Sequence, residues 1–181
     1  MTYDTVLPFL YAPQLGVKAL AFPLDSDKYY LLILLPQNSD ELNELICNIR
    51  MHTTFKYILN NLELTHIKAT IPSFKLKGMV SLTNTLQKLG IRKIFEPRQA
   101  DFTPMTNDEN IYVTNIEQAV SVTIKNYMDL TKGGRYGNHH HYPEPISFNV
   151  NHPFLYFVID SELQVILMAG KVVNPLNIRI K

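Results

Sequence analysis

Cysteine is almost absent from this chain of 181 residues, which contains only one, Cys47. A single cysteine excludes an internal disulfide framework and a cysteine-based metal site. Cys47 lies in the segment 42–49, whose apolar residues recur at helical spacing. Because an unpaired cysteine usually behaves as a small buried hydrophobic residue, we expect Cys47 to pack in the core.

The chain also lacks an excess of charge of either sign. Seventeen lysines and arginines stand against sixteen aspartates and glutamates, which gives a formal net charge of +1. This balance gives no electrostatic reason to expect binding to nucleic acid or to a membrane surface. With 46% hydrophobic residues at this length, the chain can bury a sizeable core in one domain.

Motifs of enzymes and of protein export are missing too. The sequence contains no G-x-S-x-G, no cysteine–histidine catalytic signature and no glycine-rich phosphate loop. We therefore expect neither an enzyme nor a bound cofactor. The segment 1–14 lacks the basic region and long apolar core of a secretory signal, and no N-x-[ST] glycosylation acceptor occurs.

What the sequence does contain is a β-hairpin pattern near its C-terminal end. Two apolar runs, 154–159 and 165–169, flank a polar turn at 160–164. Both runs are too short for a membrane span and are rich in aromatic and β-branched residues, which predicts strands. Neither run alternates apolar with polar residues, so we expect both faces of both strands to be buried in a covered sheet.

The remaining apolar patterns predict further short strands and helices. The expected strands are 17–24, 29–35, 64–76 (broken at Pro72), 111–116 and 119–124. The expected helices are one that starts at Ser39 as N-cap and runs through Ile49, then 54–62, and 81–89 with an apolar stripe at Leu82, Leu86 and Leu89 and Gly90 after its end. Short helices among mostly β segments, with no linker, predict one folding unit of the α+β class with antiparallel hairpins.

Several motifs in this chain resemble those of the serpins. The C-terminal signature of that family matches at His152, Pro153, Phe154, Gly170, Asn174 and Pro175, and the segments 69–76, 82–95 and 100–102 also resemble it. The resemblance covers roughly the C-terminal half of a serpin. It implies that residues 1–181 form the C-terminal part of a serpin-like domain, incomplete relative to a full serpin, and that the signature residues are structural.

The segment 125–147 has the composition of an exposed, irregular loop. It is rich in glycine, asparagine and proline, and loops of this length in a compact domain are usually functional. The resemblance places the serpin reactive-centre loop here. In that family a protease cleaves the loop, and the first part of the loop then inserts as a strand into the main sheet. The resemblance puts the candidate scissile region at His141 and Tyr142.

The start of this loop departs from the pattern of inhibitory serpins. The hinge positions read Lys125, Asn126, Tyr127 and Met128, where inhibitory serpins have an acidic residue, glycine and threonine before a run of alanines. A strand inserted into the middle of a sheet must place small or apolar side chains on its buried face. The hinge therefore predicts that this chain does not trap proteases.

Three consecutive histidines, His139, His140 and His141, are the remaining candidate for a metal site. Adjacent imidazoles cannot all face one ion with good tetrahedral geometry, and no partner ligands occur at a recognised spacing. We therefore predict a solvated loop segment and no metal. The isolated His66 is expected to be a surface or cap residue.

Three interpretations of function remain open. The chain is a serpin-like protein that is non-inhibitory or a fragment, a fragment of a secreted serine protease inhibitor that acts by loop cleavage and insertion, or a ligand- or partner-binding module on a serpin scaffold. The expected partners are a serine protease or the N-terminal half of a serpin, with no nucleic acid and no membrane. The resemblance implies an extracellular location, although this chain shows no signal peptide.

Overall fold

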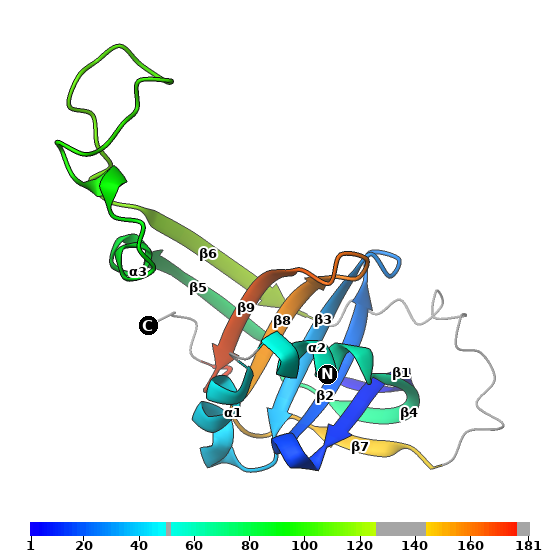
Figure 1. Ribbon diagram of the computed structural model, residues 1–181. Helices are drawn as coiled ribbons and strands as arrows, with labels where there is room; N and C mark the ends of the chain where they lie inside the picture. Colours follow the sequence, from blue (N-terminus) through cyan, green and yellow to red (C-terminus); the bar gives the residue numbers. More distant parts are fainter. Residues whose placement is uncertain (50–51, 126–143, 177–181) are drawn as a thin grey trace. The chain divides into compact units, whose positions relative to one another are not determined.

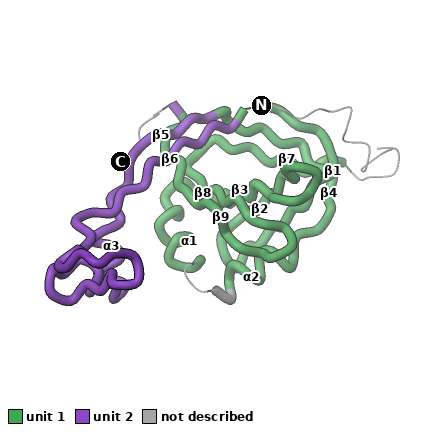
Figure 2. Tube along the Cα trace, turned by 90° about the horizontal axis from the view of Figure 1, so that it is seen from above, with its two compact units in different colours: residues 1–73, 125–175 green, residues 74–124, 176–181 purple. Residues whose placement is uncertain are grey.

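The computed structural model of this protein describes residues 1–49, 52–125 and 144–176. The chain forms two compact units, which Figure 2 shows in different colours. Unit 1 comprises residues 1–73 and 125–175, and unit 2 comprises residues 74–124 and 176–181. No helix among the described residues is long and apolar enough to cross a membrane.

Unit 1 is built on a seven-stranded sheet (Figure 1). Its strands are β1 (Thr2–Ala12), β2 (Val17–Leu24), β3 (Tyr29–Pro36), β4 (Glu63–Thr70), β7 (Ile146–Asn149), β8 (Phe154–Asp160) and β9 (Ile166–Val172). They lie in the order β7-β4-β1-β2-β3-β8-β9, and every neighbouring pair is antiparallel except β4 and β7. The predicted α+β fold with antiparallel sheets is thus confirmed, with one parallel pair as the exception.

The β2–β3 hairpin forms because its turn residues tolerate an unusual backbone conformation. Asp25, Ser26 and Asp27 have φ values of 46°, 56° and 71°, and the backbone N–H of Lys28 donates to the carbonyl of Asp25 at 3.2 Å. Short polar side chains adopt this left-handed region more readily than apolar ones. The turn therefore fixes the register of the hairpin, in which Leu20 lies opposite Ile33.

Two helices, α1 (Leu42–Ile49) and α2 (His52–Asn60), pack on one face of the sheet. Side chains alternate between the faces of a strand, so every second residue of β2, β3 and β8 points toward the helices. The rings of Phe55 on α2 and Phe157 on β8 lie 5.1 Å apart. The buried core on this face comprises Ala12, Val17, Ala19, Ala21, Leu32, Leu34, Leu155, Phe157 and Ile159 from the strands, and Leu42, Leu45, Phe55 and Ile58 from the helices.

The start of α1 differs from the expectation. Residues Ser39–Glu41 form a 3₁₀ turn ahead of the α-helix, and the N-cap is Asn38 rather than Ser39. The backbone N–H of Asn38 donates to the Glu41 carboxylate at 3.3 Å, as part of a capping box. Asn38 is a better N-cap than Ser39 because Glu41, three residues after Asn38, completes the capping box.

Cys47 is exposed, so the prediction of a buried thiol is wrong. The helix turns about 100° per residue, so Cys47 lies roughly 200° around the axis from the buried Leu45. Leu42 and Leu45 are buried, and these two residues define the face of α1 that packs on the sheet. Helical spacing identified the helix but not the side of it on which the cysteine lies.

Strand β1 was not expected from the sequence. It lies between β2 and β4, where Phe9 is opposite Leu20 on one side and Glu63 on the other. Both Val6 and Leu7 are buried, so this strand has no alternating pattern. Pro8 lies within it, and proline normally argues against a strand in the interior of a sheet.

The second of the two C-terminal strands also differs from the expectation. As predicted, β8 is buried along most of its length, but β9 is exposed from Ile166 to Ala169. The prediction that both faces of both strands are buried is therefore wrong for β9. The physical reason is its place at the edge of the sheet, where Leu167 remains 56% exposed.

Unit 2 contains a two-stranded antiparallel sheet of β5 (Phe74–Ser81) and β6 (Glu117–Ile124), together with the short helix α3 (Thr83–Lys88). The strand predicted over 64–76 is therefore two strands, because β4 ends before Pro72 and β5 begins after it, in the other unit. Residues 111–116, where a strand was expected, form no strand. Leu89, which was expected on the apolar stripe of the helix, is 74% exposed. The expected Gly90 after α3 is confirmed by its φ of 95°.

Candidate functional site

The predicted loop 125–147 connects β6 to β7. Lys125 follows the end of β6 and is exposed, whereas the other hinge residues, Asn126, Tyr127 and Met128, lie outside the described residues. The candidate scissile residues His141 and Tyr142 and the three histidines at 139–141 also lie outside them. At the far end, Glu144 and Pro145 are exposed, but Ile146 and Ser147 belong to β7, so the loop ends earlier than predicted.

The far end of the loop is fixed to the sheet of unit 1 by β7. This strand runs parallel to β4, with Ala69 opposite Phe148. Phe148 is fully buried, and its ring meets that of Phe9 edge-on at a centroid distance of 6.3 Å. Beyond the strand, the backbone N–H of Val150 donates to the carbonyl of Thr70 at 2.8 Å. The chain that follows the loop is thus held by both backbone pairing and apolar packing.

His152 joins the entry of β8 to the end of β3. Its Nε2 lies 2.8 Å from the carbonyl oxygen of Pro36, and its Nδ1 lies 2.8 Å from the side-chain oxygen of Asn151. The carbonyl can only accept, so Nε2 carries a proton and donates. After Pro153, Phe154 is buried and pairs with Val172 of β9. The histidine therefore bonds two segments that are 116 residues apart in the sequence.

Gly170 leaves room for an aromatic ring on the neighbouring strand. It lies opposite Tyr156, and a Cβ at position 170 would come within 2.5 Å of atoms of that ring. Burial raises the pKa of the Tyr156 hydroxyl above its ordinary value. The last signature residues, Asn174 and Pro175, follow β9, and Asn174 is exposed. Of the signature residues, His152, Phe154 and Gly170 make contacts within unit 1.

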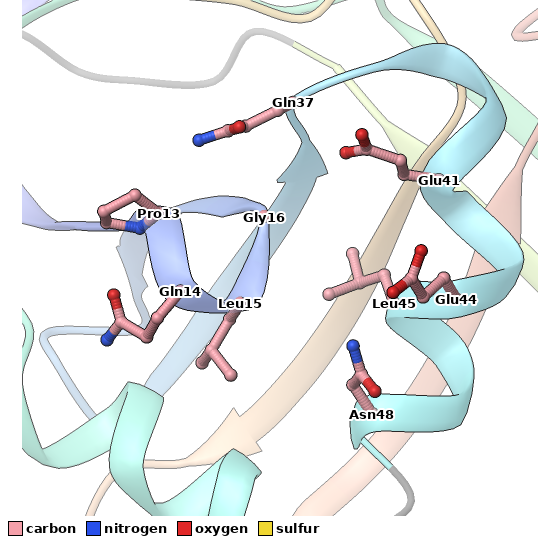
Figure 3. A pocket seen from close by; sticks show the side chains of 9 residues that line it. All are labelled: Pro13, Gln14, Leu15, Gly16, Gln37, Glu41, Glu44, Leu45 and Asn48. Atoms are coloured by element: carbon pink, nitrogen blue, oxygen red, sulfur yellow. The ribbon is translucent and has the colours of Figure 1, made fainter.

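A pocket of about 250 Å³ lies in unit 1, beside α1 (Figure 3). Glu41 and Glu44 line one wall, and the 3₁₀ turn Pro13–Leu15 lies across from them. Among its amides, Gln14 donates to the hydroxyl of Tyr57 at 2.9 Å. Glu41 ends the 3₁₀ turn ahead of α1 and Glu44 lies in the first turn of α1, where negative charge stabilises the helix. The full lining is Pro13, Gln14, Leu15, Gly16, Gln37, Glu41, Glu44, Leu45 and Asn48.

Other titratable groups form no catalytic arrangement in the described part of the chain. His66 on β4 lies 2.8 Å from a carboxylate oxygen of Asp4 on β1, a cross-strand pair with its imidazole largely covered. Among the described residues, no group of three or more histidine, cysteine, aspartate or glutamate side chains could hold a metal ion. The remaining candidate site is therefore the loop 125–147, together with β7, which holds its far end.

The comparison with known protein families decides the relationship. The family described as serpin (serine protease inhibitor) matches residues 1–175. This chain belongs to the serpin family. Among similar proteins, Serpin B10 of Otolemur garnettii is 32% identical over 149 residues, which make up 80% of this chain. Intracellular coagulation inhibitor 2 of Tachypleus tridentatus is 28% identical over 182 residues, or 95% of this chain.

Solved serpin structures share the fold. The serpin from the trematode Schistosoma haematobium matches with a TM-score of 0.75 and 25% identity over 97% of this chain. Serpin-12 of Manduca sexta matches with a TM-score of 0.81 and 21% identity over 99% of this chain. The match covers 46% and 47% of those structures, and 37% and 42% of the two relatives above. The chain thus spans less than half the length of these serpins, as the resemblance implied.

The predicted extracellular location is contradicted by these relatives. The proteins that match include Serpin B10, leukocyte elastase inhibitor A of Mus musculus and a protein named as an intracellular coagulation inhibitor. The prediction is wrong because it took a location from the serpin family as a whole. Family membership shows a shared fold but does not fix a compartment.

Proposed function

We propose that this chain is the C-terminal part of a serpin domain that does not trap proteases and has no catalytic activity of its own. The observation that carries this proposal is the hinge sequence. Tyr127 and Met128 stand where insertion as a central strand requires glycine and threonine, and Lys125 replaces an acidic residue. Bulky side chains at these positions oppose the entry of the loop into a sheet.

The surroundings of β6 support the same proposal. In a serpin the loop must insert between two strands, and the hinge follows β6 directly. Strand β6 pairs with β5 along one edge, and among the described residues no strand pairs with its other edge. Along β6 itself, Val122 alone is buried. An inserted loop would lie along this edge of β6, so the bulky hinge residues Tyr127 and Met128 would be the first to enter the sheet.

A serine protease is the proposed partner, and it acts on the loop as on a substrate. Lys132 and Arg135 offer trypsin-like cleavage sites within 125–147. Without insertion, the acyl-enzyme is hydrolysed and the protease is released. The chain is then cleaved without forming a stable complex.

Incubation with trypsin-like, chymotrypsin-like and elastase-like proteases tests this proposal on a denaturing gel. We expect only cleaved products of lower mass, and a band that contains both proteins would overturn the proposal. The matched variant restores the hinge by Lys125→Glu, Tyr127→Gly and Met128→Thr. A covalent complex formed by the variant alone would identify the hinge as the cause.

A second candidate is a fragment whose fold is completed by the rest of a serpin domain. The exposed apolar side chains of β9 favour it, because Ile166, Leu167 and Met168 all lie on the edge strand of the sheet. We expect the chain alone to be oligomeric in light scattering and to become monomeric with the complementing part. A monodisperse monomer with a cooperative thermal transition would exclude this candidate.

A further inference from the structure

Positive charge is concentrated just after α3 in unit 2. Within residues 88–98, Lys88, Arg92, Lys93 and Arg98 stand against the one acidic residue Glu96. This local excess exceeds the formal net charge of +1 of the whole chain. All four basic residues are exposed. The segment therefore produces a local positive potential.

These basic side chains are not neutralised by neighbouring carboxylates. Among the described residues, the one pair of basic and acidic side chains within 4.0 Å is that of His66 and Asp4, in unit 1. Surface lysines and arginines on a helix commonly have acidic partners three or four residues away. Helix α3 contains no acidic residue, and Glu96, four residues after Arg92, forms no ion pair with it within 4.0 Å.

The turn after α3 brings Arg92 back against the helix. Gly90 adopts a φ of 95°, and the N–H of Ile91 donates to the carbonyl of Leu86 at 3.0 Å, which reverses the chain in a Schellman motif. The Nε–H of Arg92 then donates to the carbonyl of Gln87 at 3.1 Å. This bond fixes the guanidinium beside the last turn and leaves its four other N–H groups for further partners.

A hollow of about 410 Å³ lies at this turn. Lys88 and Arg92 line it together with the side-chain amides of Asn84 and Gln87, and Glu96 completes the lining. The hollow thus combines a forked guanidinium, an ammonium group and amide donors. A carboxylate ligand could neutralise one of the two cations, whereas a doubly charged tetrahedral oxyanion can engage both at once.

We propose that this hollow, lined by Asn84, Gln87, Lys88, Arg92 and Glu96, binds the phosphate group of a phosphorylated ligand. Arg92 donates two parallel hydrogen bonds to phosphate oxygens, and Lys88 acts as a second point charge. Glu96 repels the bare anion and accepts a hydrogen bond from a hydroxyl group elsewhere on the ligand. The site lies wholly within unit 2 and does not depend on the proposed function of the loop.

Titration calorimetry of the full chain with pyrophosphate at an ionic strength of about 0.15 M, where the Debye length is about 8 Å, tests this proposal. We expect saturable binding that is tighter than that of acetate, because a carboxylate carries one charge and can neutralise only one of the two cations. Arg92→Gln and Lys88→Gln should each weaken binding about tenfold, which is the loss of one charge-assisted interaction. Glu96→Gln should tighten binding several-fold, since it removes the repulsion.

Lys75→Gln is the matched control, because Lys75 is exposed at the far end of β5 and the substitution removes the same charge from unit 2. We expect it to change pyrophosphate affinity by less than about twofold, since exposed charges beyond a Debye length are screened. An equal loss in Lys75→Gln and Arg92→Gln would overturn the proposal, as would acetate binding as tight as that of pyrophosphate. Far-UV circular dichroism checks each fold, and Glu96→Gln keeps the test valid if Arg92→Gln unfolds.

Discussion

In unit 1, seven strands and two helices enclose a continuous core, whereas in unit 2 two strands pair alone. The buried hydrophobic residues of unit 2 among those described are Phe74, Leu76, Phe95 and Val122, and all the others belong to unit 1. A two-stranded hairpin is marginally stable by itself in water. The difference indicates that unit 1 buries a much larger apolar core than unit 2 does.

The same substitution in the two units gives the largest expected contrast. Leu34→Ala removes a fully buried side chain from the core beneath α1 and α2, so we expect a loss of about 2–5 kcal/mol in the free energy of unfolding. Leu89→Ala removes a side chain that is 74% exposed and should change it by less than about 0.5 kcal/mol. Urea unfolding followed by circular dichroism measures both, and equal losses would contradict the comparison.

A close approach within unit 1 gives the next largest effect. Gly170→Ala places a Cβ 2.5 Å from the ring of Tyr156, which must move, so we expect a loss of about 1–3 kcal/mol. The double variant with Tyr156→Leu removes the ring atoms that the new Cβ would meet. Its loss should be smaller than the sum of the two single losses, and strict additivity would show that the two residues do not clash.

The cap of α1 offers a smaller contrast between adjacent residues. Asn38→Ala removes one half of the capping box with Glu41 and should cost about 1 kcal/mol of unfolding free energy. Ser39→Ala lies one residue further on, and there we expect less than about 0.5 kcal/mol. A larger loss for Ser39→Ala in urea unfolding would restore Ser39 as the N-cap.

The smallest predicted effect is electrostatic and lies in unit 2. The side-chain hydroxyl of Thr103 donates to Asp101 at 2.7 Å and its backbone N–H does so at 3.1 Å, which lowers the pKa of the Asp101 carboxyl. A lowered pKa stabilises the fold above the unfolded value of about 3.9, and this contribution is lost as the pH falls through the folded value. Thr103→Val should raise the pKa of Asp101 in a carboxyl-carbon NMR titration. An unchanged titration would show that the hydroxyl does not hold the carboxylate.

Local sequence patterns predicted most of the helices and strands. They could not predict the position of each strand in its sheet or its long-range pairing. The apolar runs at β2, β3 and β8 and the turn at Gly90 are local signals, and each is confirmed. The exposure of β9 depends on its place at the edge of the sheet, which no local pattern contains. Proline disfavours a strand in the interior of a sheet, yet β1 forms around Pro8 because its pairing with β4, distant in the sequence, stabilises it.

The same distinction between local patterns and long-range contacts applies to the candidate site. The motif that contains His152 indicated where the last hairpin begins. The hydrogen bond of His152 to Pro36 joins residues that are 116 apart, and no local pattern in either segment predicts it. The basic residues after α3 are visible in the sequence as separate charges. Their convergence on one hollow depends on the Gly90 turn, which reverses the chain so that Arg92 meets Gln87.

The pairing of β3 with β8 has a consequence for biosynthesis. Strand β3 ends at Pro36 and β8 ends at Asp160, so 124 residues must be translated after β3 before its second neighbour is complete. At typical rates of 5–20 residues per second this interval is on the order of 10 s. Throughout it, the apolar strand β3 has one unpaired edge that another nascent chain could occupy. The time at which this serpin chain is most exposed to aggregation is therefore set by its strand order.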